Sequence, residues 1–132
     1  MSDEVSARKD SILQFFVQAA NKHNFSLDIT LNVKGSLISG TLVSAKEYLD
    51  ELSESFEGGN EVAQKVSNEL SKASEEAESG SSLPEVSFIH MKHTKVFIGD
   101  SKSTPSTGKI LWRGKLSEVD GFFLGKITDS SE

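Results

Sequence analysis

LDITLNVKGSLISGTLV, residues 27–43, is the stretch that decides the fold. Every second residue from Leu27 to Val33 is apolar and the residues between them are polar, which is typical of a half-buried β-strand. Gly35-Ser36 is expected to form a tight turn, and the apolar residues after it supply a partner strand with a bend or bulge at Gly40. Residues 25–44 are therefore predicted to form a β-hairpin.

Helical periodicity lies on both sides of this hairpin. Residues 9–23 form an amphipathic pattern that starts at the capping residues Asp10-Ser11. After the hairpin, Ser44 followed by Glu47 is a capping-box signature, and it opens an insert of two helices and a loop over residues 45–84. The apolar face expected for the first helix consists of Ile12, Leu13, Phe16, Val17 and Ala20, widened by Phe15 and Ala19. That of the last insert helix is thin and consists of Val62, Val66, Leu70, Ala73 and Ala77.

The C-terminal part, residues 85–128, is strand-like again. Its strands are expected to add to the hairpin, with a turn at Asp120-Gly121 before the last strand, which runs to Ile127. The order of helix, hairpin, helical insert and strands predicts an α+β fold with a small, mainly antiparallel sheet. The length of 132 residues fits a single domain, residues 1–132.

The charge is concentrated in the insert. Residues 45–80 hold ten acidic residues and three lysines, a net charge of −7, whereas the whole chain carries −6, so the remainder is close to +1. A block of negative charge repels phosphate, which argues against nucleic acid as the partner. No apolar stretch is suited to a secretory signal or long enough to span a bilayer, so a cytoplasmic location without membrane association is expected.

No motif for catalysis or cofactor binding stands out. We therefore expect neither an enzymatic activity nor a bound cofactor. The absence of cysteine excludes thiolate metal sites and cysteine nucleophiles. His90 and His93 would suit a metal pair on a helix, but in the strand predicted here they point to opposite faces, so no metal site is expected. Neither a serine-nucleophile elbow nor a phosphate-binding loop occurs, and no carboxylate pair is singled out as a general acid or base.

The candidate contact residues are aromatic and cationic. Trp112, Arg113 and Lys115 form either a recognition patch or a strand in which the tryptophan packs on the sheet and the cations are solvated. Phe122 and Phe123 are adjacent in a predicted strand, so one faces inward and the other needs a second surface to cover it. This arrangement indicates self-association.

Most of the chain resembles the gas vesicle accessory proteins known as gas vesicle protein U. The resemblance lies in residues 12–24, Phe25 to Tyr48, Phe88 to Pro105, and Lys109 to Ile127, and its most specific runs are GKILWRGKL and VDGFFLG. It implies a cytosolic protein whose partners are gas vesicle shells and whose family influences how the shells cluster. The family has no known catalytic or cofactor residues to carry over.

A second, structural resemblance is to an Sm-like, partly open barrel. KGSLISGTL, residues 34–42, after a helix and a strand looks like the first half of that fold, and Arg113-Gly114 echoes its second half. The aspartate and asparagine of its RNA-reading loop have no counterpart in Ser44 to Tyr48, so the resemblance supports a barrel and an oligomer more than RNA binding. The leading hypothesis is thus a self-associating adaptor of gas vesicles, and the alternative is an oligomeric RNA-binding module.

Overall fold

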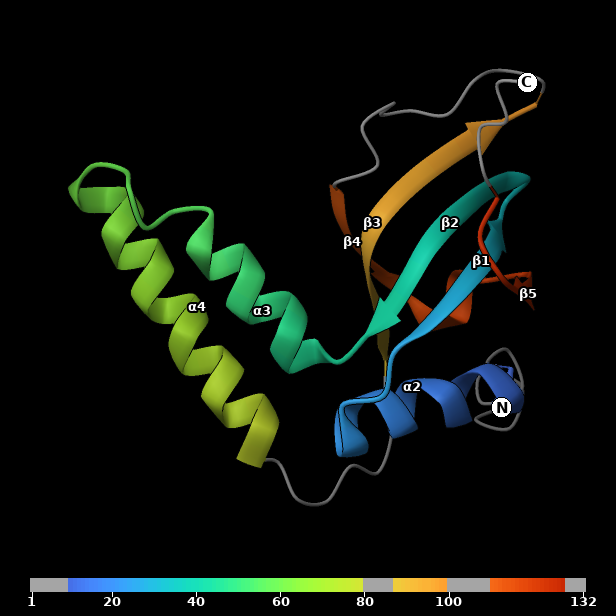
Figure 1. The fold of residues 1–132 in the computed structure, drawn as a ribbon, viewed down its shortest axis with the longest axis horizontal. Coiled ribbons are helices and arrows are strands. Elements are labelled where there is room, and N and C mark those ends of the chain that lie inside the picture. The colour runs from blue at the N-terminus through green and yellow to red at the C-terminus, as the bar shows by residue number, and fades with distance from the viewer. Residues whose placement is uncertain (1–9, 80–86, 100–109, 128–132) are drawn as a thin grey trace, which may run out of the picture.

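The computed structural model describes residues 10–79, 87–99 and 110–127, in which helices flank an antiparallel sheet of strand order β4-β3-β2-β1-β5 (Figure 1). The sheet is open, with β4 and β5 as its outer strands. The predicted α+β fold with an N-terminal helix and an acidic helical insert is therefore confirmed. In chain order the elements are α2 (Ser11–His23), β1 (Leu27–Val33), β2 (Ser36–Val43), α3 (Ala45–Glu54), α4 (Glu61–Ser79), β3 (Phe88–Ile98), β4 (Ile110–Lys115), the 3₁₀ turn η1 (Leu116–Glu118) and β5 (Gly121–Leu124).

The β1–β2 hairpin lies where the sequence predicts it, but its turn is one residue earlier than expected. Lys34 and Gly35, rather than Gly35-Ser36, occupy the turn and have φ angles of 54° and 90°. Two consecutive positive φ angles are typical of the type I′ turn, whose twist matches that of the strands it joins. The Asn32 side-chain oxygen also accepts a hydrogen bond from the Gly35 N–H at 3.0 Å.

The core lies between α2 and one face of the sheet. The Asp10 carboxylate caps α2 by accepting bonds from the Ile12 and Leu13 N–H groups. Only part of the predicted apolar face of this helix turns inward: Ile12 and Phe15 are exposed, since seven apolar side chains are too many for one helix face. The buried core consists of Leu13, Val17, Ala20, Ile29, Leu31, Ile38, Leu42, Ile89, Met91, Leu116 and Val119.

Gly40 marks a bulge where β2 meets β3. The pairing of these strands shifts register between Ser39 and Thr41, and His93 on the partner strand has a φ of 53°. A Cβ on Gly40 would lie 2.8 Å from the backbone oxygen of Lys92, closer than real Cβ atoms approach. The bulge predicted at Gly40 is thus present, and it depends on a residue without a side chain.

The opposite face of the sheet is partly polar and is crossed by the chain after β5. The buried Thr30 hydroxyl donates to the Gly125 carbonyl at 2.8 Å, and the Ile127 N–H donates to the Ser39 hydroxyl at 2.8 Å. Gly125, at φ 109°, allows this bend. The last strand therefore ends at Leu124, and the prediction that it runs to Ile127 is wrong.

Asp120-Gly121 does not form the predicted turn. η1 connects β4 to β5, and β5 pairs with β1 instead of with β4. The Asp120 carboxylate accepts a hydrogen bond from the Lys34 N–H at 2.8 Å. The backbone N–H of Asp120 donates to the Asn32 carbonyl, also at 2.8 Å. Asp120 therefore ties the start of β5 to the β1–β2 turn.

The α3–α4 arm, residues 45–79, extends away from the sheet as a helical hairpin (Figure 1). Its seam is built from serine: Ser53, Ser67 and Ser74 are buried, and the Ser53 hydroxyl lies 3.1 Å from that of Ser67. The predicted apolar face of α4 is wrong at its start, because Val62 and Val66 are exposed. Small hydroxyl side chains at helical spacing let the two helices approach closely, so the seam buries little apolar surface.

We predict that Gly40→Ala lowers the free energy of unfolding by about 2 kcal/mol, because the new methyl group must displace the β3 backbone at the bulge. Urea denaturation followed by circular dichroism measures this. Gly58→Ala is the matched control, since nothing lies within 4 Å of the position where its Cβ would stand. Equal denaturation midpoints for the two variants would contradict a close approach at Gly40.

Candidate functional site

The first group of predicted contact residues lies on β4, at one edge of the sheet. Trp112 is half-buried and packs against the core. Arg113 is exposed, but its guanidinium lies 3.8 Å from the centre of the Phe88 ring and its Nε donates to His90 Nε2 at 3.2 Å. Lys115 is exposed. The tryptophan and the two cations thus do not form one continuous patch.

Phe122 and Phe123 lie on β5, at the other edge. Phe122 is half-buried and meets Phe16 of α2 edge-on, with ring centres 6.2 Å apart. Phe123 is 50% exposed. The division into one inward and one outward phenylalanine is what strand alternation requires. It leaves an apolar ring on the surface, on a strand whose outer edge pairs with no other strand among the described residues.

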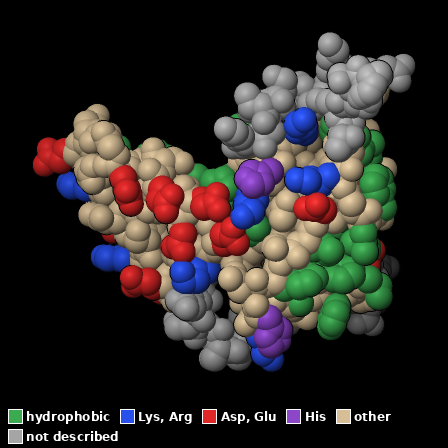
Figure 2. Space-filling model, in the orientation of Figure 1, with side chains coloured by type: hydrophobic (Ala, Val, Ile, Leu, Met, Phe, Trp, Pro, Cys, Tyr) green, Lys and Arg blue, Asp and Glu red, His purple; other side chains and the backbone are tan. Residues whose placement is uncertain are grey.

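The apolar surface around β5 extends onto α2. Ile12 and Phe15 are 58% and 64% exposed, and the Phe15 ring is 6.0 Å from that of Phe16. Figure 2 shows the hydrophobic side chains gathered over this side of the molecule, away from the acidic arm. Sequence reasoning missed the contribution of α2, although an apolar stripe too wide for one face was its signal. We call these residues the α2–β5 surface: Ile12, Phe15, Phe16, Phe122 and Leu124, together with Phe123, which projects around the β5 edge on the face of the sheet opposite α2.

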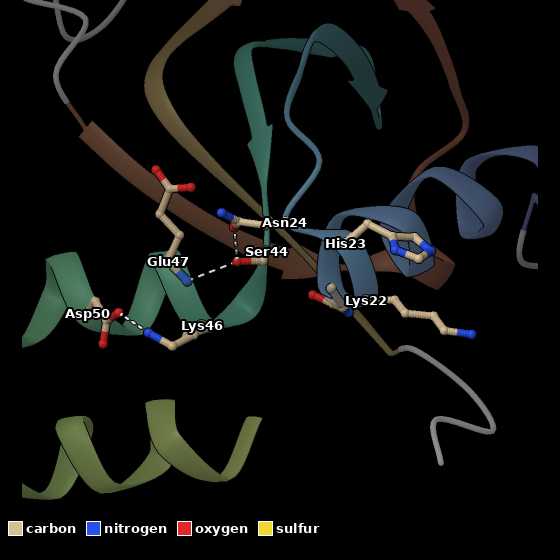
Figure 3. A pocket seen from close by; sticks show the side chains of 8 residues that line it. Lys22, His23, Asn24, Ser44, Lys46, Glu47 and Asp50 are labelled. Carbon is tan, nitrogen blue, oxygen red and sulfur yellow. Dashed lines mark hydrogen bonds and ion pairs between the residues drawn. The ribbon is translucent and has the colours of Figure 1, made fainter. Parts of the chain in front are cut away.

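A polar pocket of about 750 Å³ lies where α2 ends and α3 begins (Figure 3). The Asn21 side-chain oxygen accepts from the Ala45 N–H at 2.9 Å, and the Ser44 hydroxyl accepts from the Glu47 N–H at 3.0 Å. Lys46 pairs with Asp50 at 2.7 Å, and this bond is the main reason that the pKa of Asp50 is lowered. These hydrogen bonds and this ion pair join the start of the arm to the end of α2, and the side chains of Lys22 and His23 also line the pocket.

Only half of the predicted capping box forms at Ser44. Its hydroxyl caps α3, but the Glu47 carboxylate forms an ion pair with Lys92 of β3 at 2.7 Å. Tyr48 packs on His90 nearby, with ring centres 4.7 Å apart. The first turn of α3 is therefore fixed to the sheet.

Comparison with known proteins gives one family. The family model described as "Gas vesicle protein GvpU-like" matches residues 10–127, nearly the whole chain. The chain belongs to the GvpU-like family of gas vesicle proteins. No curated protein and no solved structure gave a match. The resemblance to gas vesicle protein U is thus confirmed, while the Sm-like alternative receives no support.

The histidines of this GvpU-like protein do not assemble a metal centre in the described part of the chain, where no three potential ligands come together. His90 is buried and His93 is exposed on the bulge of β3. Among the described residues, no helix is both long and apolar enough to cross a membrane.

The state of His90 follows from its partners. Since Nε2 accepts the bond from Arg113, the ring is neutral and its proton is on Nδ1. Burial, reinforced by the positive charge of Arg113, lowers the pKa of His90 from 6.5 to about 4. Protonation would turn the acceptor into a second donor facing a guanidinium, so the folded GvpU-like protein resists it.

We predict that acid destabilises the fold through His90. Between about pH 6.5 and 4 the unfolded chain binds a proton that the folded chain excludes, so the free energy of unfolding falls as pH falls through this window, by up to about 3 kcal/mol. Urea titrations at several pH values measure the slope. His90→Gln should flatten it, whereas His23→Gln, at an exposed position, should not. A slope unchanged in His90→Gln would contradict this assignment.

Proposed function

We propose that this GvpU-like protein is a non-catalytic adaptor that binds gas vesicles in the cytoplasm, associates with further copies of itself and so influences vesicle clustering. The observation that carries the proposal is the α2–β5 surface. Four of its side chains are more than one-third exposed, and two of them, Phe123 and Leu124, lie on β5, whose outer edge pairs with no strand among the described residues. Such patches on soluble domains are typical of interaction sites.

A second copy is the occupant that these features favour. Exposed edge strands pair readily with other strands, and β5 lacks the charged side chains that usually prevent this. Apolar side chains from α2 would extend the contact beyond the four residues of β5. Packing of Phe123 and Leu124 against a second chain would remove from water the surface that the monomer leaves uncovered.

The charged arm would set the conditions for association. Its net charge of −7 makes arms of neighbouring copies repel each other, and this repulsion is screened over about 10 Å at 0.1 M salt. Higher salt, or partial protonation of the arm carboxylates, should then favour assembly. The same charge disfavours nucleic acid as a partner.

We predict that Phe15→Ser with Phe123→Ser raises the dissociation constant for self-association at least tenfold, because two exposed aromatic side chains no longer bury on contact. Light scattering and sedimentation velocity, at low and high salt, measure the change. Val62→Ser removes an equally exposed apolar side chain from the arm and should have no effect. A monomer at every salt concentration, or an equal effect of Val62→Ser, would overturn the proposed self-association.

Binding to vesicles is tested separately by flotation with purified gas vesicles. The protein should rise with the vesicles and increase their clustering in micrographs. The variant Phe15→Ser with Phe123→Ser should cluster vesicles less. If the shell is bound by a surface other than the α2–β5 surface, this variant should still float. Protein that stays in the subnatant at every salt concentration would overturn the adaptor role.

A further inference from the structure

A groove lies between α3 and β4, at the edge of β4 that pairs with no strand among the described residues. It encloses about 750 Å³ and is lined by Glu51, Leu52, Glu54, Ser55, Ile110 and Leu111. Figure 2 shows the molecule hollowed between the acidic arm and the sheet, with acidic side chains along the arm. The groove lies at the opposite edge of the sheet from β5 and uses none of the residues of the α2–β5 surface.

One wall of this groove is a strand edge. β4 pairs only with β3 among the described strands, so the backbone N–H and C=O groups on its other side have no strand partner there. Ile110 is 43% exposed and Leu111 is half-buried, which gives the wall an apolar surface. A wall of this kind accepts an extended segment that continues the sheet.

The other wall is acidic. Glu47 and Asp50 of α3 have cationic partners, Lys92 and Lys46, each at 2.7 Å. Glu51 and Glu54, which line the groove, form no ion pair within the described residues. Burial, with Glu47 as a neighbour, raises the pKa of Glu51, although the positive charge of Lys92 acts in the opposite direction. A cation placed beside this carboxylate would stabilise its charged form.

We propose that this groove binds an extended peptide segment in which lysine or arginine alternates with apolar residues. The segment adds to the free edge of β4, and its cations face Glu51 and Glu54. Because side chains alternate along a strand, the residues between those cations turn away from α3. The segment thereby gains a hydrogen-bonded backbone and two charge pairs from opposite walls of one groove.

The probe is a fluorescein-labelled octapeptide, KVKVKVKV, with KKKKVVVV as a control of equal composition and charge. Anisotropy at low salt should show tighter binding of the alternating peptide to the full chain. Glu51→Gln with Glu54→Gln should weaken that binding roughly tenfold, as expected for two exposed charge pairs. Glu61→Gln with Glu75→Gln, at exposed arm positions outside the groove, changes the net charge equally and should leave binding nearly unchanged.

Amide chemical shifts and hydrogen exchange identify the site directly. The alternating peptide should shift and protect amides of Ile110–Lys115. Perturbation of Gly121–Leu124 instead, equal weakening by the two glutamine pairs, equal binding of the two peptides, or no binding at millimolar peptide would each overturn the groove proposal. None of these results bears on self-association, which is tested at Phe15 and Phe123, so the two proposals can fail separately.

Discussion

The rest of the structure depends on one constraint: the β1–β2 hairpin has one apolar face and one polar face, and side chains on both are buried. On one face Ile29, Leu31 and Leu42 are fully buried beneath α2, and every other strand adds to this platform. On the other face Thr30 and Ser39 are buried as well, and the chain after β5 supplies their hydrogen-bond partners. A one-residue slip of register would place these hydroxyls in the core, so the alternation fixes both the helix and the path of the C-terminal segment.

The α3–α4 arm is held by interactions different from those of the sheet. Its attachment combines the Ser44 cap, the Glu47–Lys92 ion pair and the Tyr48–His90 contact, all within the first turn of α3. Beyond that turn the two helices hold each other through a seam of serines, which contributes hydrogen bonds but little apolar burial. The net charge of −7 is thus displaced from the near-neutral sheet, and the apolar surface at β5 lies away from it.

Sequence patterns predicted the elements better than their contacts. Alternation and capping residues located α2, the hairpin and the arm, because these signals are local. The pairing of β5 with β1 was missed, since Asp120-Gly121 resembles a local turn while its hydrogen bonds go to Lys34 and Asn32, far away in the chain. From the sequence, one of Phe122 and Phe123 had to face inward and the other outward. The alternation alone did not determine which of the two faces inward. The outward position of Phe15, and with it half of the α2–β5 surface, depends on how α2 is rotated on the sheet.

An open sheet with two chemically different edges has consequences for assembly. At β5 the neighbouring side chains are aromatic and aliphatic, so contacts there depend on apolar burial, which salt weakens little. Beside β4 the carboxylates of α3 line the groove, so contacts there are screened by salt. Under the two proposals made above, salt shifts the balance from charged ligands at β4 toward copies of the same chain at β5. Because the two edges are opposite ends of one sheet, this shift needs no conformational change; it follows from where the sequence places its charges.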